Sequence, residues 1–248
     1  MLPAMRVGVY IDGYNLYYGG RRLCGKGTTG WRWLDLRTLT DSIIVRKGRW
    51  ASAALSRVVY CTARIGGSSD PGAVRDQATY IDALQAAGSV DHLEEGYYLE
   101  KTAIGPLAVA DPNTGRPVLC HPGWPLVIQD PPGQPRPNAL VLAKTLRREE
   151  KGSDVNVASH LLIDVIGGRV DAAIVISNDS DLSLPLRHAR TLVPVGLVNP
   201  SQRPTAGALR GLAAEGVGGH WWRKLTSSDL MANQLADPIG GFDKPTGW

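Results

Sequence analysis

The order of apolar and polar positions along the chain predicts strands that alternate with helices. Short apolar runs rich in β-branched residues are typical of buried strands, and they cover 7–11, 55–60, 90–99, 139–146, 172–177, 193–198 and 220–225. Apolar residues spaced three and four positions apart predict helices at 36–45, 70–87, 153–166, 182–192, 205–214 and 227–235. Strands that are apolar on both faces and alternate with helices favour an α/β fold with a central parallel sheet.

The least regular part of the chain is rich in proline and glycine and lies between residues 105 and 137. We interpret it as a β-rich insertion, at about 97–140, within a single domain that spans 1–236. The tail at 237–248 has no strong apolar periodicity and is expected to be loosely ordered.

Composition restricts the classes of protein to consider. The chain has 248 residues, of which 43% are hydrophobic, and no apolar run approaches the roughly 18 residues of a membrane span. The first six residues lack the pattern of a secretory signal, so a cytoplasmic protein without a membrane partner is expected. Three scattered cysteines disfavour a disulfide framework or a structural zinc site. A net charge of +4 suits a polyanionic partner but does not identify one.

Two predicted strands end in acidic residues. The strand at 7–11 runs into Asp12, and the strand at 172–177 runs into a loop that contains Asp179 and Asp181. In an open parallel sheet, ligands bind beyond the carboxyl ends of the strands where the strand order reverses. If the two strands are neighbours there, the three carboxylates converge, and a cation is needed to offset their repulsion. Oxygen ligands favour Mg²⁺ or Mn²⁺.

The alternative is that these acids cap the helices that follow them. Asp and Asn are favoured at helix N-caps, where each contributes about 1 kcal/mol. Asp179 or Ser180 is suitably placed to cap the helix that starts at Leu182. A cap needs one such residue, whereas this loop supplies two acids and Asn178, so the metal-site interpretation is preferred.

Asp154 is the third contribution to the predicted site. It begins a helix, where backbone N–H dipoles favour negative charge, and a cap is again the alternative. Arg147, Arg148 and Lys151 precede it and are suited to hold a phosphate near the carboxylates. His160 lies about 120° around the helix from Asp154, so we expect it to be structural or to support the site indirectly.

Four sequence blocks give the chain a resemblance to the NYN-domain family, relatives of the PIN-like nucleases, and to its LabA-like bacterial branch. The blocks follow one another in the family's order, which makes them specific together although each alone is weak. They are Val9–Tyr17, Trp33–Leu36, Glu150–Ala158 and Val175–Leu182.

The resemblance implies a three-layer α/β/α, PIN-like (Rossmann-like) fold with an acidic metal site. Matched by motif, the site acids are Asp12, Asp154, Asp179 and Asp181, which hold Mg²⁺ or Mn²⁺. Asn15 then orients the first loop, and Ser177 supplies a hydroxyl before the final acidic pair. His160 stands where many family members have an aspartate, which puts a second metal position in doubt.

The function expected from this site is metal-dependent hydrolysis of phosphodiester bonds, most simply by an endoribonuclease. A metal-bound water is the nucleophile, and the cation stabilises the charge of the transition state. The predicted substrate-binding residues are Asn15, Tyr14, Lys151, Arg148, Ser177 and Asn178.

Several alternatives to this function remain open. One is a non-catalytic module that binds RNA or protein, and another is a phosphotransferase with Asp12 as nucleophile. The phosphotransferase is disfavoured because Tyr14 occupies the position of the second acid that such sites use. RNA is favoured over DNA by the resemblance alone. A homo-oligomer is compatible with the sequence.

Overall fold

The computed structural model describes residues 4–47, 50, 52–66, 70–120, 129–130, 134–135 and 141–248. In this part of the chain, the main element is a seven-stranded sheet with the order β11-β10-β9-β1-β2-β3-β8. Its strands are β1 (Met5–Asp12), β2 (Ala53–Ala63), β3 (His92–Pro106), β8 (Leu142–Lys151), β9 (Ala172–Ile176), β10 (Val195–Asn199) and β11 (Trp221–Lys224).

Helices separate most of these strands along the chain. They are α1 (Gly13–Cys24), α2 (Leu36–Lys47), α3 (Pro71–Ala86), α4 (Ser153–Ile166), the 3-10 turn η1 (Ser180–Leu182), α5 (Ser183–Arg190), α6 (Gly207–Arg210) and α7 (Ser227–Met231). Strand β1 pairs in parallel with β2 and β9, β2 with β3, and β10 with both β9 and β11. Parallel pairing requires these crossovers, because a tight turn cannot join two parallel strands.

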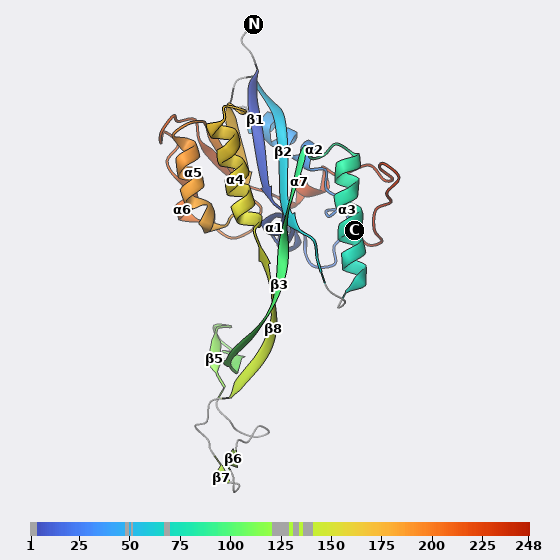
Figure 1. Cartoon of the computed structure of the whole chain (residues 1–248), viewed down its shortest axis with the longest axis vertical. Coiled ribbons are helices and arrows are strands. Elements are labelled where there is room, and N and C mark those ends of the chain that lie inside the picture. The colour runs from blue at the N-terminus through green and yellow to red at the C-terminus, as the bar shows by residue number, and fades with distance from the viewer. Residues whose placement is uncertain are drawn as a thin grey trace. The chain divides into compact units, whose positions relative to one another are not determined.

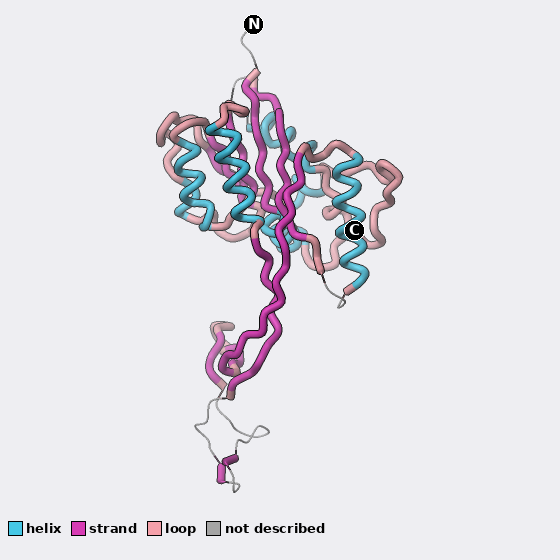
Figure 2. The backbone as a smooth tube through the Cα atoms, viewed as in Figure 1, coloured by secondary structure: helices cyan, strands magenta, loops and turns pink. Residues whose placement is uncertain are grey.

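Each face of the sheet has its own hydrophobic core. One core packs Leu39 of α2 and Leu84 of α3 against the odd-numbered residues of β1. The other packs Leu161 of α4 and Leu186 of α5 against the opposite face. Figures 1 and 2 show α4 and α5 on one side of the sheet and α2 and α3 on the other. The predicted three-layer α/β/α fold with a central parallel sheet is therefore confirmed.

The chain divides into two compact units. Unit 1 comprises Met1–Tyr98 and Glu150–Trp248, and it contains both cores. Unit 2 comprises Leu99–Glu149, close to the predicted insertion. Within unit 2, the short antiparallel pairs are β4 (Ala108–Ala110) with β5 (Pro117–Leu119), and β6 (Gln129–Asp130) with β7 (Gln134–Pro135).

Helix α1 was not predicted, and its glycines explain why. Gly19 and Gly20 lower the helical propensity of this segment. Both are buried, and a Cβ on Gly19 would clash with the carbonyl of Pro200, while one on Gly20 would meet the ring of Trp31. Close packing against the rest of unit 1 therefore requires glycine at these two positions. The same glycines weaken the helical pattern in the sequence.

The C-terminal tail differs from its expectation of loose order. The ring of Trp248 packs against Trp33 and Tyr80, with centroid separations of 6.4 and 5.6 Å. Its backbone carbonyl also accepts a hydrogen bond from Gly30. The tail is held in place by aromatic contacts with residues that are distant in the sequence, and no periodic pattern in the tail itself predicts these contacts.

No helix in the described part of the chain is long and apolar enough to cross a membrane.

Candidate active site

The strand order reverses at β1, because the chain builds β2 and β3 on one side of it and β9 to β11 on the other. Ile11 of β1 is in register with Ile176 of β9, so Asp12 and Ser177 follow these residues side by side. The carboxyl ends of these two strands form the crevice where ligands bind in open α/β sheets. The structure therefore confirms that the two strands with acidic ends are neighbours.

Asp12 is buried, with 2% of its surface exposed, and its carboxylate is held by hydrogen bonds within the protein. It accepts from the backbone N–H of Asn15 at 2.9 Å, the Asn15 side-chain amide at 2.7 Å and the Ser177 hydroxyl at 3.0 Å. Asp12 is thus the N-cap of α1. Asn15 donates two hydrogen bonds to Asp12 within the first loop, and Ser177 ties that loop to the end of β9.

Burial raises the pKa of Asp12 to about 6, against the hydrogen bonds from Asn15 and Ser177, which favour the charged form. The negative charge of Glu150 raises this pKa further. Glu150 belongs to β8, so this strand brings a further acid to the end of β1. Glu150 begins one of the sequence blocks that carry the resemblance, Glu150–Ala158, but it is not among the predicted site residues.

The loop after β9 is also organised by internal hydrogen bonds. Asp179 caps η1 by accepting from the N–H of Asp181 at 3.1 Å, and its own N–H donates to Ser177 Oγ at 3.1 Å. The Asn178 side chain donates to the carbonyl of Pro204 at 3.3 Å and accepts from the N–H of Ala206 at 3.0 Å. Asp179 is therefore a helix cap, as in the alternative interpretation. The Asn178 side chain connects this loop to the segment of Pro204 and Ala206.

The four predicted aspartates differ in their surroundings. Asp181 is exposed, Asp154 and Asp179 are half-buried, and Asp12 is buried. Asp154 lies in the first turn of α4, whose N-cap is Gly152. Among the described residues, three side chains of the kinds that bind metals have ligand atoms within 4.8 Å of one another, and these are His92, Glu94 and His160. None of the four predicted aspartates belongs to this group.

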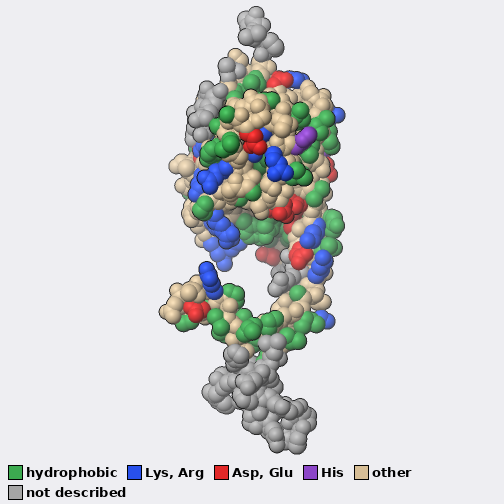
Figure 3. Space-filling view, turned by 90° about the vertical axis from the view of Figure 1, so that its left-hand side faces the viewer, with side chains coloured by type: hydrophobic (Ala, Val, Ile, Leu, Met, Phe, Trp, Pro, Cys, Tyr) green, Lys and Arg blue, Asp and Glu red, His purple; other side chains and the backbone are tan. Residues whose placement is uncertain are grey.

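The predicted phosphate-binding cations are only partly described. Lys151 is exposed at the end of β8, whereas the side chains of Arg147 and Arg148 lie outside the described residues. On the face of unit 1 that carries α4 and α5, Figure 3 shows basic side chains interspersed with acidic and apolar ones. In the described part of the chain, that face does not present a continuous basic surface of the kind that tracks a phosphate backbone.

An aromatic cavity of about 230 Å³ lies within unit 1. Gly13, which follows Asp12, and Glu150 line it, so the cavity adjoins the carboxyl end of β1. This volume lies below the range of roughly 300–1,000 Å³ that is usual for ligand pockets, so the cavity suits only a small molecule. Its aromatic walls come from α1, the segment before α2, β2, α3, β3 and the tail, and they are Tyr14, Tyr17, Tyr18, Trp31, Tyr60, Tyr80, Tyr98 and Trp248.

Three polar atoms of residues that line this cavity are buried and have no hydrogen-bond partner among the described residues. They are Glu150 Oε1, Arg32 Nε and Trp31 Nε1. The Arg32 guanidinium lies 5.5 Å from the centre of the Trp31 ring. Buried polar atoms are nearly always paired, so it is notable that three residues lining one cavity each keep a buried polar atom with no partner among the described residues. Trp31 and Arg32 are neighbours in the sequence, but only folding brings Glu150 to the same cavity, so no local motif signals the set.

Comparison with known proteins places the chain in a family. It is 31% identical, over 98% of its length and 75% of the relative's, to 6-hydroxy-3-succinoylpyridine 3-monooxygenase HspA of Pseudomonas putida (strain DSM 28022 / S16). The chain belongs to the family of this protein, and hence to an enzyme family. No family model matches the chain.

A solved structure also resembles the chain. It is a protein of unknown function, VPA0982, from Vibrio parahaemolyticus RIMD 2210633, with 13% sequence identity and a TM-score of 0.47. The match covers 93% of this chain and 99% of that one.

The family relationship corrects the functional description drawn from the sequence. The relative is named as a monooxygenase, which points to oxidation of a small pyridine compound. The terms nuclease, endoribonuclease, hydrolase and RNA-binding protein are therefore withdrawn for this chain. They followed from the strand-end aspartates and from the resemblance to NYN-domain proteins, and two of those aspartates cap α1 and η1.

Proposed function

We propose that this chain is an oxygenase of small, flat heteroaromatic acids and that the aromatic cavity of unit 1 binds the substrate. The observation that carries the proposal is that three residues lining the cavity, Glu150, Arg32 and Trp31, each have a buried polar atom without a hydrogen-bond partner among the described residues. The family relationship to a monooxygenase named for a pyridine substrate supports the same class.

The chemistry of such a substrate matches the cavity. A hydroxypyridine ring is flat, and its face can stack on Tyr17 or Trp31, whose rings lie 5.7 Å apart. The N–H or O–H of the ring can donate to Glu150. A carboxylate on the side chain of the substrate can accept from Arg32, whose planar guanidinium suits this group. A succinoyl group ends in such a carboxylate.

The reaction needs dioxygen and a two-electron donor, such as a reduced nicotinamide or flavin. One oxygen atom of O₂ enters the substrate, and the other leaves as water with two electrons and two protons. In this proposal, the chain's own residues hold the ring, pair its charged group and exclude water from the cavity. Glu150 accepts a hydrogen bond from the N–H or O–H of the ring. This bond fixes which edge of the ring faces the reacting oxygen.

Other expectations from the sequence stay predictions. They are the kinship with NYN-domain proteins, a Mg²⁺ or Mn²⁺ ion at the strand-end aspartates, a homo-oligomeric state and a cytoplasmic location. None of them is needed for the cavity to bind a small acid.

The test is turnover of 6-hydroxy-3-succinoylpyridine under ¹⁸O₂ with a reduced nicotinamide and a flavin, with the product followed by mass spectrometry. We expect one ¹⁸O atom per product molecule and consumption of O₂ that depends on the substrate. The Glu150→Gln variant should keep the fold and lose most of the turnover. A matched control is Glu100→Gln, which changes the same side chain in unit 2 outside the cavity.

Two results would contradict the proposal. The first is an absence of ¹⁸O in the product together with an absence of binding of pyridine acids to the wild type. The second is Mn²⁺-dependent cleavage of labelled RNA that is abolished by Asp179→Asn, which would restore a hydrolytic function at the strand ends.

A further inference from the structure

A cluster of two histidines and one glutamate lies on the α4 face of the sheet in unit 1. His92 Nε2 and His160 Nε2 each lie 3.0 Å from the same atom, Glu94 Oε2. The two imidazole rings have centroids 4.6 Å apart. We propose that His92, Glu94 and His160 bind one divalent transition-metal ion.

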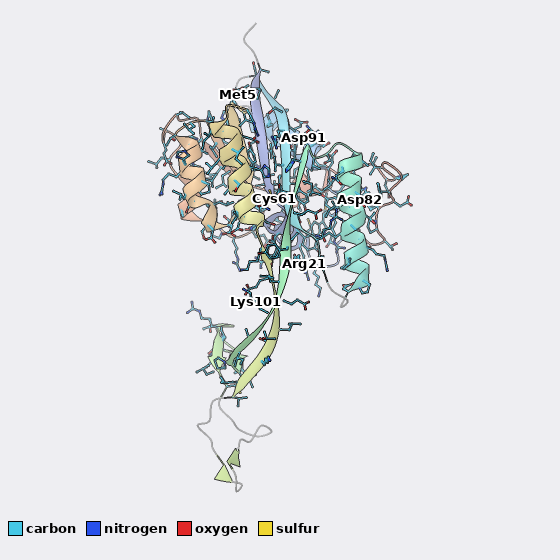
Figure 4. The ribbon with its side chains drawn as sticks, viewed as in Figure 1. Met5, Arg21, Cys61, Asp82, Asp91 and Lys101 are labelled. Atoms are coloured by element: carbon cyan, nitrogen blue, oxygen red, sulfur yellow. The ribbon has the colours of Figure 1, made fainter. Side chains whose placement is uncertain are left out.

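The fold itself brings these three side chains together. His92 and Glu94 are two residues apart on β3, so their side chains lie on the same face of the sheet. Glu94 is in register with Cys61 of β2, which in turn is in register with Asp12. Cys61, labelled in Figure 4, belongs to the core that α4 covers. Val157 and Leu161 of α4 are buried in that core, and His160 lies next to Leu161 on the same helix.

The distances suit a shared metal ion. Two ligand atoms that each lie about 2.1 Å from an ion, at right angles to one another, are about 3.0 Å apart. Both Nε2–Oε2 separations have this value, and all three ligand atoms lie within 4.8 Å of one another. The two printed separations are therefore compatible with one ion shared by the three side chains.

The donor set selects the class of metal. Two imidazoles and one carboxylate suit Fe²⁺, Co²⁺, Ni²⁺ or Zn²⁺, whereas Mg²⁺ prefers oxygen ligands alone. Three protein ligands leave coordination positions open for water or a small molecule. The exposed fractions of the side chains, 38% for His92, 39% for Glu94 and 17% for His160, allow an ion to enter.

This site is separate from the aromatic cavity, since none of its three residues lines that cavity. Its three residues also differ from the strand-end aspartates at which Mg²⁺ or Mn²⁺ was predicted. The proposal rests on its own geometry, and metal binding can be measured whether or not the oxygenase function holds.

The experiment measures metal binding directly. The full chain is treated with a chelator and titrated with Co²⁺, whose visible absorption reports coordination by imidazole, and with Zn²⁺ in a calorimeter. We expect one ion per chain, with no displacement by a tenfold excess of Mg²⁺. His92→Ala, His160→Ala and Glu94→Gln should each weaken binding more than about 100-fold, because loss of an outer-shell partner alone costs roughly 10–100-fold.

The control is His188→Ala, which removes an exposed histidine of α5 and should leave Co²⁺ binding unchanged. Circular dichroism of each metal-free variant checks the fold, and Glu94→Gln, which keeps the shape of the side chain, decides the matter if a histidine variant does not fold. Absence of stoichiometric Co²⁺ binding by the wild type would overturn the proposal. Binding that survives Glu94→Gln but is lost in Asp179→Asn would also overturn it.

Discussion

The strand-end loops around Asp12 and Asp179 and the aromatic cavity, which Gly13 borders, use their polar groups in opposite ways. In the loops, Asp12 accepts three hydrogen bonds from within the chain, and Asp179 caps η1. Of the residues that line the cavity, Glu150 and Arg32 keep buried atoms, Oε1 and Nε, that have no partner among the described residues. The acids most conspicuous in the sequence are therefore bound within the chain, whereas two inconspicuous residues each keep a polar atom without such a bond.

The comparison teaches that the type of residue at a strand end does not define its role. A carboxylate that already accepts three hydrogen bonds has less capacity left for an ion than one with an unpaired oxygen. An unpaired buried oxygen costs free energy in the empty protein, of the order of 1–3 kcal/mol. Binding of a suitable donor recovers that cost, which makes the cavity the better candidate for a ligand site.

The largest expected effect is on stability at Asp12. Asp12→Ala removes the cap of α1 and leaves the Asn15 amide and the Ser177 hydroxyl without an acceptor. We expect the free energy of unfolding to fall by about 2–4 kcal/mol, measured by urea denaturation. Asp181→Ala is the control, because Asp181 is exposed and should change stability by less than about 0.5 kcal/mol. If both substitutions lowered the free energy of unfolding equally, the buried, hydrogen-bonded Asp12 would stabilise the fold no more than the exposed Asp181, against this prediction.

The pH dependence of stability should report the burial of Asp12. Its folded-state pKa of about 6 lies above the ordinary value of 3.8, so the folded state binds this proton more tightly. The stabilisation is complete below pH 4 and is lost as the pH rises through 6. Relative to Asp12→Asn, the wild type should lose up to about 3 kcal/mol over this range in the presence of a chelator. Parallel stability curves for the two proteins would contradict the assignment.

A smaller effect is expected in the cavity at Arg32. Arg32→Met keeps much of the side-chain volume and removes the charge that would pair with a substrate carboxylate. The affinity for 6-hydroxy-3-succinoylpyridine, measured by calorimetry, should fall about 10–100-fold, as for loss of a charged hydrogen bond. Arg22→Met changes an exposed arginine outside the cavity and should have no effect. An equal loss of affinity for an analogue without a carboxylate would contradict the pairing.

The smallest effect is expected at Asp179. Asp179→Ala removes the cap of η1 and should lower the free energy of unfolding by about 1 kcal/mol. Asp179→Ser can still accept from the N–H of Asp181 and should recover most of this loss. The measurement is urea denaturation of the three proteins. A stabilising effect of Asp179→Ala would instead indicate repulsion among carboxylates that a cation normally offsets.

Local sequence signals were sufficient for much of the framework. The apolar runs predicted β1, β2, β9 and β10, and they did so because a buried parallel strand needs apolar residues on both of its faces. Boundaries were less accurate where packing sets the end of an element. Strand β3 extends to Pro106, beyond the predicted end near Leu99, and the helix expected at 205–214 is limited to Gly207–Arg210.

By itself, the sequence determined the α/β class, the order of the strands along the chain and the acidic ends of β1 and β9, because each depends on neighbouring residues. Only the tertiary structure decided what those acids do. It also assembled the cavity from α1, α3, β8 and the tail, and brought His160 of α4 to Glu94 of β3. These contacts join residues far apart along the chain, and no periodicity within one segment carries information about them.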